Sequence, residues 1–251
     1  MRKLDLAAVA QTVPYVGAPI ARHLRSRHDE VGISSEYWDD VYRRGGSSGP
    51  GSYGRLSAFK AEVLNDFIEA HGVQSVVELG CGDGYQVGLV RYPRYIGIDT
   101  SPVAVALCRE RFLGDVTKTF LVASRLGDLD LPTAELAVSL DVIYHLLEDE
   151  SFETYMSRLF RCGKRFVAIY ATDTRATSPW PDMRNRKFTD WIAANALDWS
   201  LLQKIPNRYR YSPRKPTHTS LSDFYFYERP SQPSLKRGLV DRDIRPPLLP
   251  S

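Results

Sequence analysis

The stretch that decides the fold is SVVELGCGDGYQVG (residues 75–88), followed by YIGIDTS (95–101). Residues 75–79 form a short apolar run, as in a buried strand, and glycines follow at positions 80, 82 and 84. Glycines at the end of a strand let the backbone approach a ligand closely at the carboxyl edge of a sheet. The second stretch is another short apolar run, and it ends on Asp99. Together the two stretches predict a cofactor site in an α/β fold.

The acids around the glycines indicate which cofactor binds. A dinucleotide-binding loop would place its third glycine at position 85, where this chain has Tyr85, and it needs no acid at position 78. Here Glu78 precedes the glycines, and Asp99 follows 21 positions later, where a carboxylate accepts hydrogen bonds from the ribose hydroxyls of an adenosine cofactor. A carboxylate at position 78 would repel a pyrophosphate but attract the amino group of a methionine moiety. The pair therefore favours S-adenosylmethionine over NAD.

Strand-like and helical patterns alternate outward from the glycine loop. The further predicted strands are 95–99, 119–123, a strand that begins at 135, and 165–171. The predicted helices are 57–72, 101–112, 151–162 and 187–196, with a weakly helical segment at 85–91. Strands that are apolar on both faces and alternate with helices indicate a parallel sheet covered by helices. Because 199–205 and 223–229 predict a terminal hairpin, the expected fold is a Rossmann-like, doubly wound α/β sheet of about seven strands that ends in an antiparallel hairpin.

The domain organisation follows from composition along the chain. Residues 1–56 are expected to form an N-terminal cap with a glycine-rich lid at 45–54, because that tract has too few apolar residues to pack. Residues 57–229 are expected to form the catalytic domain. Residues 230–251 are rich in proline and are expected to form a disordered tail outside the fold.

The overall composition is that of an ordinary globular protein, with 251 residues of which 43% are hydrophobic and 25% charged. Three cysteines without paired spacing argue against a zinc module and a disulfide scaffold, so a cytoplasmic location is expected. The net charge of only +3 gives no strong case for nucleic acid or membrane binding. Gln11 and Pro14 interrupt the first apolar segment, so no signal peptide is expected.

The glycine loop and Asp99 resemble motif I and its partner acid in the class I S-adenosylmethionine-dependent methyltransferases. The segment 136–150, in which an apolar strand runs into Asp141 and then His145, also matches that family's pattern. The resemblance extends roughly over residues 57–229. It implies that Glu78, Gly80 and Gly82 line the methionine end of the cofactor, Asp99 the ribose and residues 123–125 the adenine. Many members carry an acid or amide where this chain has Ser124, so the adenine contact is expected to be a backbone one.

Two groups near the expected methyl position could assist methyl transfer to a hydroxyl. His145 is the candidate general base, because it lies just past the fourth strand; the alternative is a histidine that only packs under the cofactor. Asp141 and Asp173 end neighbouring strands and could together hold Mg²⁺. The alternative is that Asp141 only contacts the cofactor and Asp173 only caps a turn.

The acceptor side is predicted from the insertion at 171–191. It contains Trp180 and the arginines 175, 184 and 186, which suit a hydroxyl-rich ligand, although a charged solvated loop has the same composition. A looser resemblance to small bacterial methyltransferases of sugars and polysaccharides, including a mycobacterial one for methylmannose polysaccharide, favours a saccharide hydroxyl. Tyr53 or Arg55 in the lid is expected near the cofactor carboxylate.

The expected function is thus O-methylation of a small-molecule or oligosaccharide acceptor. A methyltransferase of another natural product is the first alternative. A nucleic-acid methyltransferase and a non-catalytic, cofactor-binding subunit are the others. A homodimer is left open.

Overall fold

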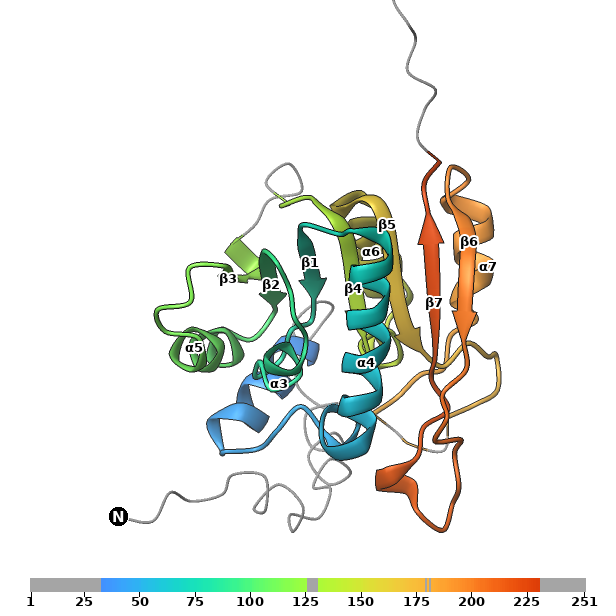
Figure 1. Cartoon of the computed structure of the whole chain (residues 1–251). Coiled ribbons are helices and arrows are strands. Elements are labelled where there is room, and N and C mark those ends of the chain that lie inside the picture. Colours follow the sequence, from blue (N-terminus) through green and yellow to red (C-terminus); the bar gives the residue numbers. More distant parts are fainter. Residues whose placement is uncertain (1–32, 126–130, 179, 181, 231–251) are drawn as a thin grey trace, which may run out of the picture.

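The structure is a computed structural model that describes residues 33–125, 131–178, 180 and 182–230. It contains a seven-stranded sheet with helices packed on both faces (Figure 1). The strands are β1 (Val76–Leu79), β2 (Tyr95–Asp99), β3 (Lys118–Val122), β4 (Ala134–Leu140), β5 (Gly163–Ala171), β6 (Ser200–Ile205) and β7 (Asp223–Glu228). The helices of this part of the chain are α3 (Ile33–Arg43), α4 (Gly54–His71), α5 (Pro102–Arg111), α6 (Asp149–Cys162) and α7 (Phe188–Asn195).

The strand order is β3-β2-β1-β4-β5-β7-β6. Strands β1 to β5 run parallel, and β7 lies antiparallel to both β5 and β6. This topology confirms the predicted doubly wound sheet with a terminal antiparallel hairpin. The chain winds outward from β1 in one direction and from β4 in the other, so the carboxyl ends of these two central strands border the switch point where ligands bind in such sheets.

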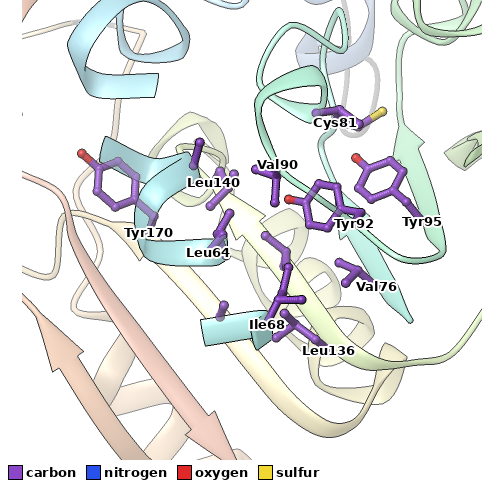
Figure 2. Close-up of a cluster of buried hydrophobic side chains, with 14 of the residues drawn as sticks. Leu64, Ile68, Val76, Cys81, Val90, Tyr92, Tyr95, Leu136, Leu140 and Tyr170 are labelled. Carbon is purple, nitrogen blue, oxygen red and sulfur yellow. The ribbon is translucent and has the colours of Figure 1, made fainter. Parts of the chain in front are cut away.

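The sheet lies between two apolar cores, one on each face. Along β5, Phe166, Ala168 and Tyr170 belong to one core, whereas Val167 and Ile169 belong to the other. This alternation follows from the two-residue period of a strand. The first core includes α4 and α5, and Figure 2 shows some of its residues, among them Leu64, Ile68, Leu136 and Tyr170. The second core includes α6 and α7.

The helix boundaries follow local signals that the sequence contains. Helix α4 ends where Gly72 adopts a left-handed conformation with φ of 61°. Helix α5 begins after Ser101, whose hydroxyl accepts a hydrogen bond from the amide of Ala104. The predicted weak helix at 85–91 is reduced to a 3₁₀ turn, Val87–Leu89. Glycines at 84 and 88 lower the helical propensity there.

The predictions for the two ends of the chain fall largely outside the described residues, since segments 1–32 and 231–251 are not described. The glycine-rich tract is described, and it contains a 3₁₀ turn, Pro50–Ser52. Helix α4 then starts at Gly54, three residues before the predicted start at 57. Within the described ranges, no helix is both long and apolar enough to cross a membrane.

Candidate active site

The glycine loop after β1 needs glycine at two positions because both the backbone conformation and the space require it. Gly80 has φ of +86°, and a Cβ there would lie 2.4 Å from Cγ2 of Val142. Gly82 has φ of +57°, and its Cβ would lie 2.5 Å from Oγ of Ser48. A side chain at either place would therefore be strained and would push away a neighbouring segment. The glycine loop therefore forms a cradle that is bordered by Ser48 on one side and by Val142, just after β4, on the other.

Glu78 is the buried acid at the base of this cradle, with an exposed fraction of 2%. The hydroxyl of Tyr95 donates a 2.6 Å hydrogen bond to its Oε2. Burial raises the pKa of Glu78 to about 7, while the Tyr95 hydrogen bond and the charge of Lys60 act in the opposite direction. Because this pKa is close to 7, the carboxyl of Glu78 readily loses its proton when a cation binds beside it.

Asp99 ties the glycine loop to the end of β2. One carboxylate oxygen accepts a 2.8 Å hydrogen bond from the amide of Gly82, and the other accepts one of 2.9 Å from the amide of Ser101. Burial raises the pKa of Asp99, and these two amides oppose that shift by stabilising the charge. Each carboxylate oxygen has a second lone pair that a ribose hydroxyl can use.

Helix α3, which the sequence analysis did not predict, lies across the cradle. The ring of Trp38 packs edge-on against His145, with 5.2 Å between ring centroids. The hydroxyls of Tyr42 and Ser48 are 3.0 Å apart, and Asp39 accepts a hydrogen bond from the Ser101 hydroxyl. The signal that could have revealed this helix is the spacing of the apolar residues 33, 37, 38, 41 and 42.

The glycine-rich tract does pack, in contrast to the expectation that it could not. Two of its contacts are hydrogen bonds: the Asp83 amide donates one of 3.2 Å to the Ser48 hydroxyl, and the Tyr53 hydroxyl donates to the Asp83 carboxylate. The ring of Tyr53 also packs against that of Tyr85, with 4.4 Å between centroids. The structure thus places Tyr53 against the glycine loop. Arg55 lies elsewhere, because its Nε donates to the carbonyl of His218 at 2.7 Å.

His145 ends a 3₁₀ turn, Ile143–His145, that follows β4. Its Nδ1 lies 3.4 Å from the carbonyl oxygen of Asp182. A carbonyl can only accept, so Nδ1 carries the proton and Nε2 keeps its lone pair. Burial lowers the pKa of His145 below its usual 6.5, with a partial opposing effect from Asp182 and Asp141. The imidazole is therefore neutral at pH 7, as a general base must be.

Asp141 and Asp173, the two predicted metal ligands, each have a lysine partner. The buried Nζ of Lys60 lies 2.7 Å from Oδ2 of Asp141, whose backbone adopts a left-handed φ of 58°. Asp173 pairs with Lys187 and also accepts from Thr189. Among the described residues, no three histidine, cysteine or acidic side chains are grouped as metal ligands. The two carboxylates as arranged do not fit a Mg²⁺ site, and no catalytic step is assigned to a metal.

The remaining predicted residues lie around the edge of the site. Ser124 is exposed in a 3₁₀ turn, Ala123–Arg125, directly after β3. In the insertion after β5, Trp180 packs edge-on against Tyr211 with 5.9 Å between centroids. The insertion's arginines are paired with acids: Arg175 with Asp190, and Arg184 and Arg186 with Asp149. The sequence had suggested that they were available for a hydroxyl-rich ligand.

Comparison with known proteins places this geometry in a chemical class. A family model described as a methyltransferase domain matches residues 76–165, which contain the glycine loop, Asp99, Asp141 and His145. The chain is an S-adenosylmethionine-dependent methyltransferase. The match thus includes both segments on which the predicted methyltransferase rested.

Relatives of this methyltransferase differ in what they act on. It is 26% identical over 215 residues to EEF1A lysine methyltransferase 4 of Mus musculus, covering 76% of this chain and 73% of that protein. It is 32% identical over 114 residues to a probable S-adenosylmethionine-dependent methyltransferase of Mycolicibacterium smegmatis, covering 43% of this chain and 42% of the relative. These relatives confirm the reaction class without specifying a saccharide.

A solved structure shows the same fold. Magnesium protoporphyrin IX methyltransferase from Synechocystis PCC 6803 with bound S-adenosylhomocysteine has a TM-score of 0.58 at 17% identity, covering 79% of this chain and 98% of that one. The cradle fits S-adenosylmethionine, because Glu78 is a buried carboxyl with a pKa of about 7 that can pair with the methionine amino group. When bound, S-adenosylmethionine supplies an electrophilic methyl group on a sulfonium.

Proposed function

We propose that this methyltransferase methylates a hydroxyl oxygen of a saccharide, with His145 as the general base. The observation that carries the proposal is a neutral imidazole whose Nε2 is left as a proton acceptor by the bond from Nδ1 to the Asp182 carbonyl. An alcohol keeps its proton at neutral pH, so a base within hydrogen-bond reach accelerates its attack. A sugar hydroxyl is an acceptor that needs such a base.

Aromatic rings near His145 support a sugar as the acceptor. Trp38 lies beside the imidazole, and Trp180 with Tyr211 forms a second aromatic pair on the insertion after β5. Sugar rings present apolar C–H faces between their hydroxyls, and aromatic faces pack against such surfaces. The paired arginines of the insertion do not contribute to this argument.

The cofactor-binding roles belong to the same proposal. Glu78 binds the methionine amino group, Asp99 binds the ribose hydroxyls, and Gly80 and Gly82 allow the close backbone approach. Asp141 orients the segment that leads to His145. Ser124 lies at the adenine edge. Tyr53 holds the lid against the glycine loop, and Arg55 reaches the cofactor carboxylate only if it leaves the His218 carbonyl. Residues 1–56 act as a cap and lid of the domain at 57–229.

An acceptor panel tests the proposed substrate class. Purified full-length protein is incubated with labelled S-adenosylmethionine and with oligosaccharides, phenols, lysine-containing peptides and tRNA. We expect label in the saccharide fraction, at an oxygen and not at an amine, and its loss in His145→Ala. Label in peptide lysines or in tRNA with none in saccharides would show that the acceptor class is wrong while the methyltransferase assignment holds.

The titration of Glu78 predicts how cofactor affinity depends on pH. Because its folded pKa is about 7, Glu78 is protonated at lower pH and must lose that proton to bind the methionine amino group. Affinity for S-adenosylhomocysteine should therefore rise about tenfold per pH unit below about 7 and level off above it. Calorimetry from pH 5.5 to 7.5 measures this, with Glu78→Gln as the variant whose affinity no longer changes with pH.

The same pKa shift sets a stability trend without ligand. The pKa of Glu78 is raised above its usual 4.5, so the folded protein binds this proton more tightly than the unfolded chain. The contribution of Glu78 to the free energy of unfolding is fully present below about pH 4.5, its usual pKa, and is lost as the pH rises through about 7. A native protein with the same cofactor affinity at pH 5.5 and 7.5 would contradict the role of Glu78.

A further inference from the structure

A solvent-open cavity of about 370 Å³ lies beside the segment that carries His145. It is lined by Phe152, Arg175, Arg184, Asn185, Arg186, Lys187 and Asp190. Four of these seven residues are cationic and one is acidic. The volume is within the range of about 300 to 1,000 Å³ that small-molecule sites occupy.

The three arginines of this cavity pair with exposed carboxylates, whereas Lys187 pairs with the buried carboxylate of Asp173. Arg175 pairs with Asp190, but its side chain remains 81% exposed. Arg184 and Arg186 share a single carboxylate, that of Asp149, which is itself 66% exposed. Ion pairs between exposed side chains contribute little, so a ligand with more negative charge can replace the carboxylates. A phosphate group offers more charge and more acceptor oxygens than one carboxylate.

Arg186 is the fixed member of the set. Its side chain is 9% exposed, and its guanidinium lies 4.8 Å from the centroid of the Phe152 ring. Its Nη2 donates to the carbonyls of Leu146 and Leu147. Within the described residues its Nε has no hydrogen-bond acceptor. The Nη1 that contacts the exposed Asp149 carboxylate is the donor that an oxyanion in the cavity can take over.

The lining is continuous with the support of the catalytic turn. The amide of Arg184 donates to the Tyr144 carbonyl at 2.7 Å, and its Nη1 donates to the Leu147 carbonyl at 2.7 Å. The Asp182 carbonyl accepts from His145. Residues 182–186 thus hold the turn 144–147 on one side and line the cavity on the other. A ligand in the cavity would lie next to the segment that positions the base.

We infer that this cavity is a binding site for a phosphate group, formed by Arg175, Arg184, Arg186 and Lys187. Guanidinium groups bind phosphate through paired N–H donors, and Lys187 adds a point charge. On the proposed function, the phosphate is carried by the saccharide acceptor, as a sugar phosphate or a glycosyl diphosphate. The site itself is independent of which atom receives the methyl group.

The test uses pyrophosphate as the probe and the full chain without cofactor. Titration calorimetry at low salt should show saturable binding to the native protein. The variant Arg175→Ala/Lys187→Ala, which keeps the residues that support the His145 turn, should bind pyrophosphate at least about tenfold more weakly. The control is Arg165→Ala/Lys204→Ala, which removes the same charge from exposed cations on β5 and β6 that also pair with carboxylates. Its affinity should change less than about twofold.

Absence of saturable pyrophosphate binding, or equal weakening in both double variants, would overturn the site. A second arm compares sugar phosphates with the same unphosphorylated sugars as methyl acceptors. A higher kcat/KM for the phosphorylated sugar that disappears in Arg175→Ala/Lys187→Ala supports the acceptor role. Pyrophosphate binding without methylation of any sugar would leave the phosphate site standing and contradict the saccharide proposal alone.

Discussion

We expect His145→Ala to lower methyl transfer about 10²- to 10⁴-fold while the affinity for S-adenosylhomocysteine stays nearly unchanged. The imidazole would take the proton from the acceptor hydroxyl at Nε2, because Nδ1 is bonded to the Asp182 carbonyl. Since burial lowers its pKa, the native rate should rise with pH with a midpoint below 6.5 and then level off. Steady-state rates from pH 5 to 9 measure both effects.

His218→Ala is the matched control, because this exposed histidine contributes only its backbone carbonyl to the bond with Arg55. It should keep the native rate and pH profile. EDTA should leave turnover unchanged, because Asp141 and Asp173 are each paired with a lysine. Full activity of His145→Ala across this pH range would remove the imidazole from the mechanism, and silencing by EDTA would assign the role to a metal.

Asp99→Ala should weaken cofactor binding by roughly 1.5 to 3 kcal/mol, which is about 10- to 150-fold in Kd. The substitution removes the acceptor for the ribose hydroxyls. It also leaves the amides of Gly82 and Ser101 without their carboxylate partner, so the glycine loop loses its tie to β2. Calorimetry with S-adenosylhomocysteine measures the affinity, and thermal unfolding measures the loss of loop support.

Asp99→Asn separates these two effects, because its amide oxygen can still accept one of the two backbone bonds. Asp115→Ala is the control, since this carboxylate pairs with Lys118 in the turn before β3. It should leave the affinity for S-adenosylhomocysteine unchanged. An Asp99→Ala protein with native affinity, or tighter binding of NAD than of S-adenosylhomocysteine to the native protein, would contradict the assigned role of Asp99.

Local patterns accounted for most of the fold and for the cofactor loop. The cofactor loop could be predicted because its parts lie close together in sequence: a buried strand, the glycines after it and the acid that ends the next strand. The turn after the strand also needs backbone conformations that glycine adopts most readily. The predicted strand 95–99 matches β2, and the N-cap Ser101 begins α5 as expected. The prediction of a weak helix at 85–91 was wrong, because nearby glycines lower the stability of a helix relative to a turn.

Pairings between distant segments required the tertiary structure. Lys60 is in the middle of a helix and has no sequence neighbour that explains its burial, but the fold places it against Asp141, which directly follows β4. The contact between Trp38 and His145 joins residues 107 positions apart. Arg186, which the sequence suggested as a residue that binds a hydroxyl-rich ligand, forms an ion pair with Asp149 in the fold.

Sequence patterns were enough to predict the α/β class, the cofactor and a candidate base, because hydrophobic period, glycine conformation and strand-end acids act over a few residues. The fold was needed to show which charges are neutralised, which lone pair of His145 is available and where a basic cavity opens. These properties depend on distance and burial, since the energy of a charge is set by the groups and the solvent around it.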